Sequence, residues 1–162
     1  VEKVGPVIAH PIRDRAGLAQ LRALEPARDL PAIIEAVRLV RGELAPHRAV
    51  LGFAGAPFTL ASYLIEGKSS RDFVRTKAIM HGDPALWAEL MERLCDVVVA
   101  FLRANAAAGA DALQLFDSWV GALSATDYAT HVRPWTQRIF AQLQDLGVPL
   151  VHFGTGTAHI LD

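Results

Sequence analysis

The side chains able to do chemistry cluster at the ends of three short apolar runs. Tyr63 follows the run that ends at Phe53. Asp117 and Ser118 follow a second run, and His152 lies in a third. A phenol or hydroxyl can donate a hydrogen bond to a polar ligand, a carboxylate can act as acid or base, and an imidazole can titrate or bind metal. Hydrogen bonding and proton transfer are therefore the chemistry that these run ends offer.

The same side chains also have ordinary structural roles. Tyr63 can pack with its phenol toward water, and His152 can be satisfied by neighbours within a strand. Asp117 and Ser118 can cap a turn. A zinc site needs more ligands than His152 and His159 supply. Residue type alone leaves both interpretations open at each position.

Composition argues against several classes of protein. Lys and Arg number 16 against 17 Asp and Glu, a net charge of -1, which argues against a broad basic face for nucleic acid. No apolar run reaches the roughly 18 residues of a membrane span, and no signal-peptide pattern opens the sequence. The single cysteine, Cys95, excludes an internal disulfide and a multi-cysteine metal site, and it fits a reducing, cytoplasmic setting. We expect no nucleic-acid partner and no membrane partner.

Apolar periodicity orders the chain into alternating helices and strands. Short apolar runs predict strands over 49–53, 111–116 and 149–153. Helical spacing predicts helices over 18–24, 30–45, 59–66, 70–80, 83–109 and 124–147, the last with a break at Pro134. Asp83 before a proline and Ser124 in a capping-box pattern support two of the helix starts.

Strands separated by long helical stretches are typical of parallel βα units in an α/β fold. The predicted strands are apolar on both faces, which suits buried positions. A doubly wound sheet and a (β/α)₈ barrel both begin this way, and both place their chemistry at the carboxyl ends of the strands.

The three strand ends also carry a sequence likeness. Residues 52–67 resemble the signature of the uroporphyrinogen decarboxylase family, and residues 109–119 and 148–154 are similar to that family's following strand ends. The segments occur in the family's order with compatible spacing, and the resemblance runs over essentially the whole chain. This sequence departs from the family pattern at Phe58, where members usually carry Trp. The exchange of one aromatic residue for another is tolerant of the change in volume.

The resemblance implies roles for three residues. Tyr63 matches the family's substrate tyrosine, Ser118 matches the Ser or Thr that binds substrate at the second strand end, and Phe53 matches a position lining the pocket floor. The family's key aspartate is expected upstream of Val1. The resemblance therefore assigns no catalytic residue within the chain itself.

The resemblance also implies a fold and a reaction. The family fold is a (β/α)₈ TIM barrel, so residues 1–162 are expected to be a partial domain with about three βα units and both ends missing. The family removes the four acetate carboxyl groups of uroporphyrinogen, giving coproporphyrinogen in haem and porphyrin biosynthesis. It works as a homodimer with no metal or organic cofactor, because a protonated pyrrole ring supplies the electron sink. We expect the same tetrapyrrole substrate and the same oligomer for the full-length protein.

Two alternatives stay open. Zinc-dependent methyltransferases of the same superfamily carry a His-x-Cys pair at a strand end, whereas residues 152–154 are His-Phe-Gly and Cys95 lies on a predicted helix. The thiolate that such chemistry needs is thus missing at this place. The other alternative is a catalytically incomplete fragment, since three βα units leave two sheet edges open.

Overall fold

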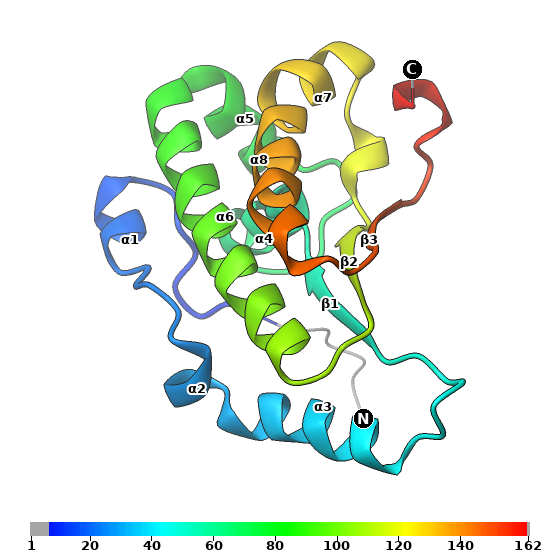
Figure 1. Ribbon diagram of the computed structural model, residues 1–162. Coiled ribbons are helices and arrows are strands. Elements are labelled where there is room, and N and C mark those ends of the chain that lie inside the picture. Colours follow the sequence, from blue (N-terminus) through cyan, green and yellow to red (C-terminus); the bar gives the residue numbers. More distant parts are fainter. Residues whose placement is uncertain (1–6, 162) are drawn as a thin grey trace, which may run out of the picture.

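The computed structural model describes residues 7–161, so the ends of the predicted partial domain, residues 1–6 and 162, lie outside the described part. A three-stranded parallel sheet consists of β1 (Leu51–Gly55), β2 (Ala112–Asp117) and β3 (Leu150–Gly154), in the order β1-β2-β3. Figure 1 shows the two helices α6 and α8 packed side by side in front of this sheet. The predicted α/β class with parallel strands is confirmed.

Helices supply the rest of the regular structure. They are α1 (Arg15–Ala19), α2 (Pro26–Asp29), α3 (Pro31–Glu43), α4 (Pro57–Glu66), α5 (Val74–Gly82), α6 (Pro84–Ala107), α7 (Ala125–His131) and α8 (Arg133–Leu143), with short 3₁₀ turns η1 (Val120–Ala122), η2 (Gln144–Leu146) and η3 (Ala158–Ile160). None of the helices within residues 7–161 is both long enough and apolar enough to cross a membrane.

Predicted capping residues start and stop several helices. The Asp83 carboxylate accepts from the N–H of Leu86, and the Ser124 hydroxyl accepts from the N–H of Asp127. Pro134 occupies the first turn of α8, so the predicted break separates α7 from α8. Gly67 ends α4 with φ of 82°, a left-handed conformation that glycine adopts without a steric penalty.

The predicted helix over 18–24 is wrong. The helix starts earlier, because Asp14 caps it by accepting from the N–H of Gly17, and it ends at Ala19. The carbonyls of Leu18 and Leu21 then accept hydrogen bonds from the guanidinium of Arg93 on α6. A long-range partner thus replaces the helical bonds that the local sequence pattern predicted.

Each strand ends one or two residues beyond its predicted limit. Gly55 is predicted to begin a turn, but it stays in the ladder opposite Phe116, and the N–H of Ala56 donates to the carbonyl of Phe116 at 2.9 Å. A Cβ at Gly55 would come within 2.8 Å of the Leu60 side chain, so glycine lets the strand run close beneath α4.

The expectation of strands buried on both faces is correct on one face only. Leu113 and Leu115 of β2 are buried on the side that α6 covers. On the opposite side Phe53 is 59% exposed, Val151 40% and Phe153 42%. The described part of the chain therefore forms a two-layer structure, in which helices cover one face of the sheet and the other, apolar face is open.

Cys95 lies in the core between α6 and α8, as its place on the apolar helix face predicts. Its side chain is fully buried, and burial raises the pKa of the Cys95 thiol to about 12. The thiolate is the reactive form of cysteine. At pH 8 a pKa of about 12 leaves roughly one thiol in ten thousand deprotonated.

We therefore expect the folded protein to resist thiol reagents. Cys95 should release almost no chromophore from a disulfide-exchange reagent at pH 8 over minutes, and one equivalent after unfolding in guanidinium. Rapid reaction of the folded protein at this position would show that α6 and α8 open locally.

Candidate active site

The ends of β1 and β2 bring two predicted site residues to one edge of the sheet. Helix α4 starts directly after β1 and carries Tyr63, whose ring lies against Trp119 with 4.1 Å between ring centroids. Trp119 follows Ser118 in the loop after β2 and also packs against Phe73, at 5.2 Å. This aromatic stack holds α4 beside the loop that carries Ser118.

A second contact connects the loop of Ser118 to the end of β3. The hydroxyl of Thr155 donates to the carbonyl oxygen of Ser118 at 2.6 Å. Close by, Gly121 faces the backbone of residues 155–156, and a Cβ at this position would meet the carbonyl oxygens of both, the one of Gly156 at 2.7 Å. Backbone atoms cannot rotate aside as a side chain would, so glycine is required for this close approach.

We expect the Gly121→Ala substitution to separate the two loops. The added methyl group forces the backbone near Thr155 to move, which should destabilise the protein by about 1–3 kcal/mol. Urea denaturation measures this loss. Gly82→Ala is the matched control, because a Cβ there meets no atom within 4 Å. Equal stability of the two variants would show that the loops adapt freely.

Phe53 is separated from this edge and lies on the open face of the sheet. Its ring packs edge-on against Phe116 at 5.5 Å between centroids, and Phe116 packs against Phe153 at 5.3 Å. One phenylalanine from each strand thus forms a row across the sheet. Such a row offers an apolar surface to a large ligand.

Asp117 lies on the other side of β2, among the helices. Its carboxylate is fully buried, accepts from the Thr59 hydroxyl at 2.9 Å, and lies 3.4 Å from Nε2 of His152. Burial, and after it the negative charge of Asp117, raise the pKa of the nearby Tyr128 phenol. Asp117 is therefore neither a turn cap nor an exposed acid, and His152 is satisfied by neighbours, as one of the two interpretations predicted.

This buried network connects the sheet to the candidate site. Thr59 and Tyr63 are one turn apart on α4, so the bond from Thr59 to Asp117 fixes the start of the helix that carries Tyr63. Asp117 also directly precedes Ser118 in the chain. We interpret Asp117 as a residue that positions both, an assignment that the sequence pattern did not contain.

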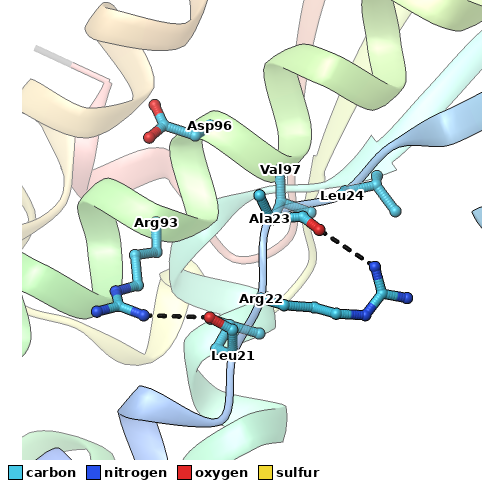
Figure 2. A pocket seen from close by; sticks show the side chains of 7 residues that line it. All are labelled: Leu21, Arg22, Ala23, Leu24, Arg93, Asp96 and Val97. Atoms are coloured by element: carbon cyan, nitrogen blue, oxygen red, sulfur yellow. Dashed lines mark hydrogen bonds between the residues drawn. The ribbon is translucent and has the colours of Figure 1, made fainter.

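A pocket of about 340 Å³ lies away from these strand ends, between residues 21–24 and α6 (Figure 2). It is lined by Leu21, Arg22, Ala23, Leu24, Arg93, Asp96 and Val97. Arg93 donates across it to the carbonyl of Leu21 at 3.1 Å, and Arg22 forms an ion pair with Asp29 at 2.6 Å. No predicted site residue lines this pocket, so the strand ends are the candidate site.

A family model described as uroporphyrinogen decarboxylase (URO-D) matches residues 1–162. The chain belongs to the uroporphyrinogen decarboxylase family. Two curated relatives, both named uroporphyrinogen decarboxylase, come from Thermus thermophilus, 52% identical over 162 residues, and Thermobifida fusca, 56% identical over 158 residues. The alignments cover 100% and 98% of this chain but 47% and 43% of those proteins. The chain thus spans about half the length of the relatives it matches.

A solved structure shares the fold of this member of the uroporphyrinogen decarboxylase family. It is a methyltransferase from Methanosarcina mazei, with a TM-score of 0.70, 18% sequence identity, and coverage of 96% of this chain and 43% of that one. At this identity the likeness shows the fold alone. This likeness does not support the zinc methyltransferase alternative. The thiolate ligand is still missing, because residues 152–154 contain no cysteine and Cys95 is buried between helices.

Proposed function

We propose that the chain is the middle part of a uroporphyrinogen decarboxylase, a carboxy-lyase that converts uroporphyrinogen to coproporphyrinogen. The observation that carries this proposal is the family match over all 162 residues, with 52–56% identity to the two relatives of that name. The remaining βα units of a TIM barrel continue the sheet at the free edges of β1 and β3. The complete enzyme acts as a cytoplasmic homodimer without a cofactor.

In this proposal the open sheet face is the inner wall of the barrel. The row of Phe53, Phe116 and Phe153 is the apolar surface under the tetrapyrrole macrocycle. A macrocycle of this size needs a broad apolar contact, because apolar area removed from water contributes roughly 25 cal/mol per Å². The exposure of Phe53, at 59%, supports a role in contacting something beyond the described residues.

Tyr63 and Ser118 supply hydrogen-bond donors at the rim of this surface. The substrate carries eight carboxylates, four on acetates and four on propionates. A phenol and a hydroxyl on neighbouring strand ends suit these acceptors, and positive groups from outside the chain neutralise the others. Tyr63 donates near the reacting acetate, and Ser118 donates to another carboxylate.

The reaction at each acetate balances without an external oxidant or reductant. Protonation of the pyrrole ring creates a cationic electron acceptor. The bond between the methylene and the carboxylate breaks, its electron pair moves into the ring, and carbon dioxide leaves. The methylene then takes up a proton and becomes a methyl group while the ring proton is lost. An aspartate outside this chain stabilises the cationic intermediate electrostatically.

An anaerobic assay of the full-length protein with uroporphyrinogen tests the proposal. We expect successive loss of four carboxyl groups and accumulation of coproporphyrinogen, measured chromatographically after oxidation to the porphyrins. Complete absence of this product, from folded protein, would refute the proposal.

A further inference from the structure

A cluster of three metal-binding side chains lies outside the candidate active site, between α5 and α7. His81 belongs to the last turn of α5, and Asp127 and His131 are four residues apart on one face of α7. Each offers one ligand atom, and the three atoms all lie within 4.8 Å of one another. Figure 1 shows α5 and α7 at the same end of the molecule.

We propose that His81, Asp127 and His131 bind one zinc ion. Two imidazole nitrogens and one carboxylate oxygen form a donor set typical of zinc with an open fourth position. Bonds of 2.0–2.1 Å in a tetrahedron place neighbouring ligand atoms about 3.3 Å apart. Nε2 of His81 and Oδ1 of Asp127 are already 3.5 Å apart. The side chain of His81 is 51% exposed, which leaves water access to the fourth position.

The direct contacts within the cluster are one long ion pair and one edge-to-face ring pair. At 3.5 Å, Nε2 of His81 and Oδ1 of Asp127 lie within ion-pair distance but farther apart than the 2.7–2.9 Å of a charge-assisted hydrogen bond. The rings of His81 and His131 pack edge to face, nearly perpendicular at 86°, with 5.3 Å between centroids. The three groups face one another with their ligand atoms within 4.8 Å, an arrangement that one ion could bridge.

The backbone around two of the ligands is held independently of any metal. The indole N–H of Trp87, a buried residue of α6, donates to the carbonyl of His131 at 3.0 Å. The N–H of Asp127 donates to the Ser124 hydroxyl at 3.0 Å. Ligands on a rigid frame lose little entropy on binding, which favours a site that is ready before the ion arrives.

Zinc bound here would stabilise the loop after β2, which carries Ser118. Helix α7 follows the loop that carries Ser118, and α5 already contacts that loop through Lys77, whose ammonium donates to the carbonyl of Ala122 at 3.0 Å. A bridge from His81 to α7 adds a second connection between the same two elements. In this proposal the ion connects α5 with α7, and its role is independent of the proposed decarboxylation.

The test is a zinc titration of the full-length protein, without a histidine tag and stripped by a chelator, in competition with a chromophoric zinc indicator. We expect one zinc per chain, and at least a tenfold weaker affinity after Asp127→Asn or His131→Gln. Zinc should raise the melting temperature of the unsubstituted protein and leave that of Asp127→Asn unchanged. Magnesium should do neither, because it prefers oxygen ligands.

Two control variants separate this site from other histidines. His47→Gln changes an exposed histidine elsewhere, and His152→Gln changes the one at the third strand end; both should keep the full affinity. Equal zinc affinity in Asp127→Asn and the unsubstituted protein, or no binding at micromolar zinc, would overturn the proposal. Loss of zinc in His152→Gln alone would also overturn it and place the ion where the methyltransferase alternative requires it. Melting curves of the apo variants show whether each one is folded.

Discussion

Replacing Tyr63 by Phe in the full-length enzyme should lower kcat/KM for uroporphyrinogen at least tenfold while the protein melts at nearly the same temperature. The substitution removes only the phenolic oxygen. The ring keeps its stack on Trp119, at 4.1 Å between centroids, so the packing that joins α4 to the loop after β2 survives. A tenfold loss corresponds to about 1.4 kcal/mol of transition-state stabilisation, the size expected for one hydrogen bond to a charged group.

Comparison with Tyr63→Leu distinguishes the contribution of the hydroxyl from that of the aromatic ring. This variant also loses the stack on Trp119, so it should lower both kcat/KM and the melting temperature. The pair of variants therefore distinguishes a group that contacts substrate from one that only packs. Normal kcat/KM in Tyr63→Phe would remove the phenol from the proposed site and leave the ring as a packing residue.

Replacing Asp117 by Ala should be the most destabilising of the substitutions considered, by about 2–4 kcal/mol in urea denaturation. The carboxylate is fully buried, and its removal leaves the Thr59 hydroxyl without its acceptor. His152 loses its polar neighbour at 3.4 Å, and a small cavity forms. Because Thr59 lies in the first turn of the helix that carries Tyr63, the remaining folded protein should also have reduced kcat.

Asp117→Asn is the matched control, because an amide oxygen can still accept from Thr59 and fills the same volume. It should recover most of the stability lost in the alanine variant. A double-mutant cycle of Asp117→Ala with Thr59→Val tests the contact itself, with an expected coupling of about 1 kcal/mol. Strictly additive effects of the two substitutions would show that the hydrogen bond is unimportant for stability.

Local sequence signals were sufficient for most of the fold. The caps at Asp83 and Ser124 and the break at Pro134 depend only on neighbouring residues, and all three appear as predicted. The short helix near residue 18 was misplaced because the carbonyls that would continue it bind Arg93, which is more than 70 residues away in the chain. A local pattern carries no information on such a partner.

The sequence located the segments of the candidate site but did not reveal the role of every residue in it. The sequence placed Tyr63 and Ser118 after the ends of two predicted strands, and in the structure a contact through Trp119 holds their segments together. The role of Asp117 was hidden, because residue type does not show on which side of the sheet a strand's last residue points. Alternation from Leu113 and Leu115 was the available signal, since every second residue of β2 faces the helices. The roles of Tyr63, Ser118 and Phe53 in binding substrate stay predictions.

The order of the strands has a consequence for how the protein forms on the ribosome. Strands β2 and β3 each pair with the strand that precedes them in the chain, so the partner has already been synthesised when either one emerges. The 24-residue α6, which covers the buried faces of β1 and β2, is also complete before β2 appears. Structure can therefore accumulate from the amino end onward during translation, with the newest strand serving as the template for the next βα unit.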